Sequence, residues 1–348
     1  MTRSLTPALT LSALLLAGCA SVAPLPTPAA QTAPAVSDAL AAQPTPADAT
    51  ALQAQAVAPA DFVLLIRGLE PFYSPSAHKD NSVTPAGCDT YFRDMIQYFY
   101  NQDALWGSKL RTVGFYDKQA PSSCYVNLKD VRPPKPYSSN LLLENRTFTN
   151  DTSIVQLGQR LAWWVYTNYT AKGYTVSLVG HSLGGLVARV AVGASGKDPR
   201  FPPTLAVKTM MTLNTPNNGA TFASLANNVT WSCNTQCKEM TPGSDFLRVL
   251  NTDWDSGNSG VKYRFNLGGS NDYVVGDTRS SAIGGTGSAC YYTNPSFDHG
   301  SILTDPSGRE DATMKCWNDR RTAYTQAPVT ATGQRHPLSS TFLWATSP

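Results

Sequence analysis

The chain has 348 residues, of which 27 are Lys or Arg and 24 are Asp or Glu, so the formal net charge is +3. This near balance, without any long basic run, argues against a nucleic-acid partner. The length leaves room for one folded domain of ordinary size after an unusual N-terminal segment.

The first residues have the proportions of a secretory signal. Arg3 supplies a positive charge, and the apolar stretch from Leu5 to Leu16 is too short to cross a bilayer as a helix. The stretch ends in Leu-Ala-Gly-Cys, which resembles the bacterial lipobox. This resemblance implies a signal peptide at 1–18, cleavage before Cys19, acylation of Cys19, and a protein exported and lipid-anchored to the bacterial cell envelope. The alternative is an ordinary signal peptide with an incidental cysteine.

The next segment differs in composition from the rest of the chain. Residues 19–60 are rich in Ala, Pro, Thr and Gln, and lack aromatic side chains. Such a segment cannot bury enough apolar surface to fold, so we expect a disordered tether behind Cys19. The folded domain should then occupy 61–348.

Within 61–348, apolar runs that indicate buried strands alternate with amphipathic segments that indicate helices. Strands are expected at 62–66, 111–116, 174–179, 207–213 and 261–267, and helices at 89–101, 153–172 (with Gly173 as its stop) and 186–192. Alternation of this kind predicts a mostly parallel sheet with helices on both faces. Catalytic groups in such sheets lie at the carboxyl ends of the strands.

The segment Gly180-His181-Ser182-Leu183-Gly184-Gly185 lies between a predicted strand and a predicted helix. The turn between them is so tight that side chains at positions 180 and 184 would collide with the neighbouring strand and helix. Ser182 is therefore expected at the apex of a strained turn with its hydroxyl exposed, as a nucleophile. The alternative is a glycine-rich turn with an incidental serine.

A serine nucleophile needs a histidine to accept its proton, and the chain has four. His181 is expected to pack the turn, and His78 precedes the serine. The order Ser, acid, His of α/β hydrolases leaves His299, in a turn-rich loop, and His336. His299 is the preferred base.

The acid should follow the strand expected at 261–267, where a carboxylate can reach back over the sheet edge. Asp272 occupies that position, and its rivals are Asp255, Asp277 and Asp298. Asp298 is less suitable because consecutive residues seldom orient one another usefully. Asp272 is therefore the predicted acid.

The backbone N–H of Leu183, which follows the nucleophile, should donate to the oxyanion of a tetrahedral intermediate. An apolar strand entering Arg67-Gly68, the G-H-S-x-G turn and the later Thr215-Pro216 segment together resemble bacterial lipases of the α/β hydrolase superfamily. The resemblance covers about 62–299 and implies an α/β hydrolase fold with loop or cap insertions, and a second oxyanion donor at Leu69. Those lipases have His-Gly where this chain has Arg67-Gly68. Arg67 must order the loop differently, or it binds an anionic part of the substrate.

Six cysteines follow Cys19, and an even number in an exported protein favours three disulfides. Fifteen connectivities are possible, and pairing of nearest neighbours needs the smallest loops: Cys88–Cys124, Cys233–Cys237 and Cys290–Cys316. A metal site at Cys233 and Cys237 is the rival interpretation, but no histidine lies nearby. We expect no metal and no organic cofactor.

Two segments, 117–150 and 217–258, are too long to be simple connections, and both should lie over the nucleophile. Apolar side chains of the second, including Phe222 and Leu225, are candidates for an acyl pocket. Alternatively, they only pack the insertion onto the sheet.

The sequence as a whole predicts a carboxylic ester hydrolase of the lipase or esterase type. Its partners would be an ester or lipid substrate and a membrane surface reached through Cys19. One alternative is a non-catalytic envelope binding or scaffold protein with the same fold. Another is an acyltransferase, thioesterase or polyesterase.

Overall fold

The computed structural model describes residues 60–69, 91–116, 124–134, 148–149, 151–220, 235–254, 261, 263–275, 288–294, 297–304, 313–318, 323–325 and 336–346. The chain divides into two units, Met1–Leu52 and Gln53–Pro348, and all described residues belong to the second. The predictions for the signal peptide, Cys19 and the tether before Ala60 lie outside the described residues. The same holds for His78, Cys88, Phe222, Leu225, Cys233, Asp255 and Asp277.

The described strands form one sheet of nine in the order β3-β2-β1-β4-β5-β6-β7-β8-β9. They are β1 Phe62–Ile66, β2 Leu110–Gly114, β3 Tyr125–Asn127, β4 Val176–His181, β5 Val207–Leu213, β6 Tyr263–Gly269, β7 Ser288–Asn294, β8 Thr313–Asn318 and β9 Ala323–Thr325. Neighbouring strands from β3 to β7 pair in parallel. β8 pairs antiparallel with β7, and β9 pairs antiparallel with β8. The mostly parallel sheet predicted from the sequence is confirmed.

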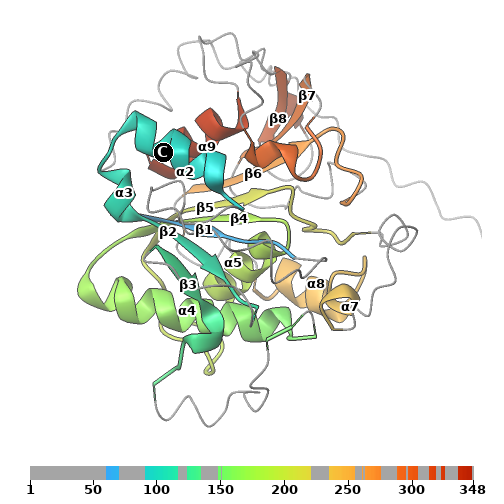
Figure 1. Ribbon diagram of the computed structural model, residues 1–348. Coiled ribbons are helices and arrows are strands. Elements are labelled where there is room, and N and C mark those ends of the chain that lie inside the picture. The colour runs from blue at the N-terminus through green and yellow to red at the C-terminus, as the bar shows by residue number, and fades with distance from the viewer. Residues whose placement is uncertain are drawn as a thin grey trace, which may run out of the picture. The chain divides into compact units, whose positions relative to one another are not determined.

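Helices cover both faces of this sheet (Figure 1). The α-helices are α2 Arg93–Gln102, α3 Trp106–Lys109, α4 Ile154–Asn168, α5 Leu183–Ala194, α7 Thr235–Glu239, α8 Asp245–Asn251 and α9 Pro337–Thr346, and the 3-10 turns are η2 Leu128–Asp130, η4 Thr170–Lys172 and η7 Ser301–Leu303. In Figure 1, α4 and α5 lie on one face, and α2, α3 and α9 lie on the other. This is the α/β hydrolase fold.

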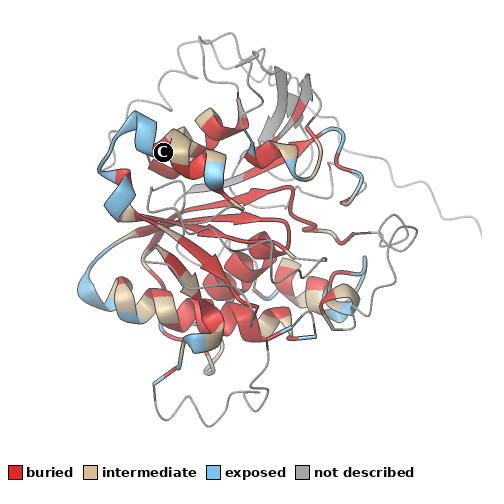
Figure 2. Ribbon diagram, viewed as in Figure 1, coloured by how far each residue is buried: buried red, intermediate tan, exposed pale blue. Residues whose placement is uncertain are grey.

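Side-chain alternation along β1 explains the two layers. Leu64 and Ile66 join the apolar cluster under α4 and α5, while Val63 and Leu65 join the cluster under α2 and α9. Successive strand residues point to opposite faces, so a continuous apolar run supplies both cores. Figure 2 shows the central strands buried along their length.

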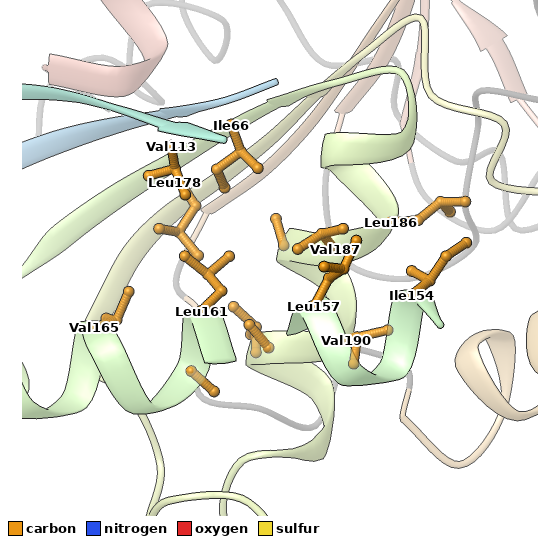
Figure 3. Packing of buried hydrophobic residues seen from close by; sticks show 14 of the residues in the cluster. Ile66, Val113, Ile154, Leu157, Leu161, Val165, Leu178, Leu186, Val187 and Val190 are labelled. Atoms are coloured by element: carbon orange, nitrogen blue, oxygen red, sulfur yellow. The ribbon is translucent and has the colours of Figure 1, made fainter. Parts of the chain in front are cut away.

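The first core is a tight sandwich of strands and two helices (Figure 3). Leu178 of β4 packs with Leu161 of α4 and Val187 of α5 in one cluster. The two helices approach closely at Gly158, where an added Cβ would lie 2.4 Å from a methyl group of Val190. This packing holds the start of α5, and with it residue 182, against the sheet.

The helix expected at 153–172 is shorter than predicted. The Ser153 hydroxyl caps its start by accepting from the N–H of Val155 at 3.1 Å, and α4 ends at Asn168. Tyr169 leaves helical geometry with φ −125° and ψ −67°, and the 3-10 turn η4 continues to Gly173, whose φ is 80°. Gly173 thus ends the segment as expected, but one turn after the α-helix.

Three of the six cysteines after Cys19, namely Cys124, Cys237 and Cys290, are disulfide-bonded. Cys290 of β7 lies opposite Cys316 of β8 in the antiparallel register. Opposed residues of antiparallel strands have Cα separations of the size that a disulfide requires. The predicted pairing of all six cysteines stays a prediction.

Among the residues that the structure describes, no helix has the length and apolarity needed to span a bilayer.

Candidate active site

Ser182 stands at the turn between β4 and α5 in a conformation that non-glycine residues rarely adopt, with φ 53° and ψ −129°. A Cβ at position 180 would lie 2.5 Å from the backbone of residues 184 and 185. One at position 184 would lie 2.3 Å from the carbonyl oxygens of Ile66 and Arg67. The predicted need for glycine at both places is confirmed. A Cβ at position 185 would collide with the side chain of Thr215, in the loop after β5.

The structure brings Ser182, His299 and Asp272 together. His299 Nε2 lies 2.9 Å from Ser182 Oγ, and His299 Nδ1 donates to Asp272 Oδ2 at 2.9 Å. The three residues follow β4, β6 and β7, strands whose carboxyl ends share one edge of the sheet. With its Nδ1 proton held by the carboxylate, His299 presents a lone pair at Nε2 to the serine hydroxyl.

Asp272 is fixed by its own loop. Its Oδ1 accepts from the N–H groups of Val274 and Val275, both at 3.0 Å, and its side chain is 2% exposed. Its rival Asp298 instead accepts from the N–H groups of Gly300 and Ser301, which shapes the turn after His299.

The other described candidate base, His336, lies beside Phe297 with their ring centroids 5.7 Å apart. Its Nδ1 accepts from the N–H of Leu338 near the start of α9. Of the two histidines that the chain order allows, the structure therefore places His299 at the serine.

His181 packs beneath the turn, as predicted, and it is 3% exposed. Its Nε2 lies 2.7 Å from the backbone oxygen of His299, and its Nδ1 lies 2.5 Å from Tyr91 Oη. Burial, reinforced by the nearby His299 ring, holds the pKa of His181 well below its ordinary value, despite the hydrogen bond with the His299 carbonyl. His181 is therefore neutral at physiological pH.

Asn214, which the sequence did not single out, connects the loops that carry the acid and the base. Its Nδ2 donates to the backbone oxygens of Asp298 and His299 at 2.9 and 3.3 Å, and its Oδ1 accepts from the N–H of Gly269 at 2.7 Å. Its φ is 43°, in the left-handed region that asparagine tolerates better than most residues. The signal available in the sequence was an asparagine directly after the apolar run that forms β5.

Arg67 packs inside the protein rather than lining the cavity at the serine. It is 4% exposed, and its guanidinium carbon lies 5.4 Å and 5.3 Å from the ring centroids of Tyr91 and Tyr125. This stacking is a cation–π arrangement that holds the residue before Gly68. It supports the first of the two roles predicted for Arg67, ordering of the loop, over contact with an anionic substrate.

A cavity of about 360 Å³ opens at Ser182, a volume within the usual range for small-molecule sites. Most of the surface that lines it is apolar. The lining residues are Leu69, Tyr91, His181, Ser182, Pro216, Ala220, Met240, Val274, Val275, His299, Gly300, Leu303 and Thr304. A mostly apolar cavity at Ser182 can accommodate an acyl chain or another apolar group. Met240 belongs to the predicted insertion 217–258, so this insertion contributes to the cavity wall.

The wall at Met240 is anchored by α7. Gln236 accepts from the Tyr116 hydroxyl at 2.9 Å and donates to the Thr152 carbonyl at 2.8 Å. Glu239 accepts from the Ser153 hydroxyl at 2.6 Å and from the N–H of Ile154 at 2.7 Å, at the start of α4. The helix N-terminus carries unpaired N–H groups and a positive dipole end, so it offsets part of the cost of burying the carboxylate.

Replacing Glu239 by glutamine should make stability less dependent on pH. Burial raises the pKa of Glu239 above its ordinary value of 4.5, although the bonds from Ser153 and Ile154 oppose this shift. A raised pKa means that the folded state holds the Glu239 proton more tightly than the unfolded state does. The contribution of Glu239 to the free energy of unfolding is therefore complete below pH 4.5 and is lost as the pH rises through the folded pKa. The wild type should therefore lose stability relative to Glu239→Gln between pH 4.5 and 7.5, as measured by urea unfolding.

The same carboxylate-to-amide change at the exposed Asp245, which pairs with Arg248 on the surface of α8, serves as the matched control for the urea measurements. If the difference in unfolding free energy between wild type and Glu239→Gln is the same at pH 4.5 and 7.5, the raised pKa of Glu239 is contradicted.

Comparison with protein families gives one match. Residues 138–241 match the family described as "Putative serine esterase (DUF676)". This stretch contains Ser182 together with α4, β4, α5 and β5. No curated protein sequence matches the chain.

Solved structures with some similarity include three hydrolases. The Bacillus licheniformis lipase BlEst2 in its propeptide form is 16% identical with a TM-score of 0.41, over 76% of this chain and 52% of that chain. The phospholipase PlaB from Legionella pneumophila is 13% identical with a TM-score of 0.42, over 83% of this chain and 59% of that chain. The esterase domain of a Rhodothermus marinus protein is 13% identical with a TM-score of 0.34, over 72% and 82% of the two chains. This chain thus spans about half the length of the first of these proteins.

Proposed function

We propose that this protein is a serine hydrolase that cleaves carboxylic esters through an acyl-enzyme. The observation that carries the proposal is the chain of contacts from Ser182 through His299 to Asp272, with both distances at 2.9 Å, beside a mostly apolar cavity. The match of residues 138–241 to a family of serine esterases supports it.

The reaction follows from this geometry. Ser182 Oγ attacks the ester carbonyl carbon while His299 Nε2 takes the hydroxyl proton, and the carbonyl oxygen becomes an oxyanion. The N–H groups of Leu183, at the start of α5, and of Leu69 are the proposed donors to that oxyanion. The intermediate expels the alcohol, which receives the proton from His299. Water then attacks the acyl-enzyme by the same steps and releases the acid.

Asp272 has two functions in this scheme. Its bond to His299 Nδ1 holds the imidazole in the tautomer that can accept the serine proton. Its negative charge stabilises the imidazolium that forms during both half-reactions. Because Val274 and Val275 hold the other carboxylate oxygen, this acceptor stays aimed at the histidine.

We also propose that the enzyme is exported and anchored to the bacterial envelope through acylated Cys19. The apolar N-terminal stretch and the Leu-Ala-Gly-Cys sequence support this location. Two or three acyl chains on one residue would hold the protein stably at a membrane, whereas a single chain would bind only marginally.

One labelling experiment tests both parts of the proposal. A fluorophosphonate probe should modify the full-length protein at Ser182, and Ser182→Ala should abolish labelling and the hydrolysis of p-nitrophenyl esters. The labelled wild type should be found in the membrane fraction, and the Cys19→Ser variant outside it. A folded wild type that the probe does not modify would favour the binding or scaffold alternative. If Cys19→Ser and the wild type distribute equally between the membrane and soluble fractions, the lipid anchor is refuted and the esterase function is unaffected.

A further inference from the structure

A single line of hydrogen bonds joins the loop after β1 to the loop that carries His299. The Gly68 N–H donates to Tyr91 Oη at 3.1 Å, Tyr91 Oη contacts His181 Nδ1, and His181 Nε2 contacts the His299 carbonyl oxygen at 2.7 Å. These residues lie on separate elements: the loop after β1, the segment before α2, the end of β4 and the loop after β7.

The chemistry of the groups fixes the direction of each hydrogen bond. A carbonyl oxygen only accepts, so His181 Nε2 carries the imidazole proton and donates it to the His299 carbonyl. His181 is neutral, so its Nδ1 can only accept, and Tyr91 must donate its hydroxyl hydrogen to it. Tyr91 Oη is then left with lone pairs, and one of them receives the N–H of Gly68.

We propose that Tyr91 and His181 are positioning residues, which hold the oxyanion loop and the base in register with Ser182. The proposal rests on the esterase function proposed above. In this proposal the hydrogen bonds from Gly68 through Tyr91 and His181 to His299 support catalysis by holding other groups in place. The side chains of Tyr91 and His181 do not exchange protons with the substrate.

The first consequence concerns the oxyanion loop. Gly68 is packed so closely that a Cβ on it would lie 2.6 Å from Tyr91 Oη and 2.7 Å from the Cβ of Ser182. Its N–H is engaged by Tyr91, so the next N–H along the chain, that of Leu69, remains for the substrate. Arg67, the residue before Gly68, contacts the ring of the same tyrosine and so joins the loop to Tyr91 a second time.

The second consequence concerns the base. The backbone carbonyl of His299 accepts a hydrogen bond from His181 and its side chain donates one to Asp272, so both ends of the residue are held. The two imidazole rings lie 4.8 Å apart between centroids. A neutral His181 adds no positive charge beside the imidazolium that forms on His299 during the reaction.

The decisive test is Tyr91→Phe in the full-length enzyme, with Tyr98→Phe on α2 as the matched control. We expect Tyr91→Phe to lower kcat about 10- to 100-fold, less than the loss of a whole oxyanion donor, with KM within about twofold of wild type. Affinity for an alkyl boronic acid, whose adduct with Ser182 is tetrahedral, should fall by the same factor as kcat/KM. Tyr98→Phe should resemble the wild type in kcat, KM and boronic acid affinity.

A second pair of variants keeps the test informative if Tyr91→Phe does not fold. His181→Gln retains one N–H donor and one acceptor, whereas His181→Leu has neither. The glutamine variant should therefore keep at least about tenfold more kcat than the leucine variant. A purely structural role would reduce both by similar factors.

The outcomes separate the two proposals. If the fluorophosphonate does not label the wild type, the esterase function fails and the positioning role fails with it. If the wild type is labelled and Tyr91→Phe keeps wild-type kcat and boronic acid affinity, only the positioning role is refuted. Equal kcat in His181→Gln and His181→Leu would also refute it.

Discussion

Replacing His299 by alanine should lower kcat by about 10⁴-fold or more while the protein stays folded. The imidazole is the group 2.9 Å from Ser182 Oγ, and without it the hydroxyl has no base to take its proton. Single-turnover hydrolysis of p-nitrophenyl butyrate and a thermal melt would measure activity and folding together. His336→Ala is the matched control and should retain activity within a few fold.

Asp272→Asn should cost about as much, since an asparagine amide can hold His299 in the wrong tautomer. A mild loss in this variant, combined with a severe loss in Asp255→Asn or Asp277→Asn, would reassign the acid. Full activity in His299→Ala would refute the proposed mechanism itself.

The second large effect is expected at Gly184. An alanine there would place its Cβ 2.3 Å from two carbonyl oxygens at the end of β1, and backbone atoms cannot move aside as a flexible side chain can. We expect a loss of stability of about 3 kcal/mol or more, the upper end of the usual cost of overpacking. The displaced turn should also lower kcat/KM at least about 100-fold, because positions within a catalytic site tolerate little displacement.

Gly107→Ala is the control for this change. Among the residues that the structure describes, its Cβ would meet only the Tyr100 side chain, at 3.4 Å, so alanine in α3 should be neutral or slightly stabilising. Urea unfolding of both variants gives the comparison. A Gly184→Ala protein with wild-type stability and activity would show that the turn relaxes in a way that its packing does not suggest.

The central part of the fold was predictable because local patterns and tertiary burial agree there. The strand expected at 207–213 is β5 with the same bounds, since each of its residues is buried and the run is bounded by turns. The antiparallel edge, β7 to β9, was not predicted. Strands of this kind depend on pairing with a neighbour, and the sequence around Ser288 shows no strong apolar run.

The site also divides into residues that local sequence patterns mark and residues whose roles depend on distant contacts. Ser182 and Asp272 were predictable because each follows a strand expected from the sequence, and strand ends of a parallel sheet converge. His299 was predictable from the chain order Ser, acid, His and from its turn-rich loop, although the strand before it was not expected. Tyr91 and Glu239 were not predictable, because their roles depend on partners far along the chain. Tyr91 is separated from His181 by 90 residues, and Glu239 from Ser153 by 86. No pattern within one segment reports such a contact.

The anchoring of α7 has a consequence for how substrate range can change. Met240 borders the cavity, but the segment before it is tied to the start of α4 through Gln236 and Glu239, apart from the strand ends that carry the reacting groups. For the ester hydrolase proposed here, we therefore expect substitutions in this wall to alter which substrates fit while the contacts among Ser182, His299 and Asp272 persist.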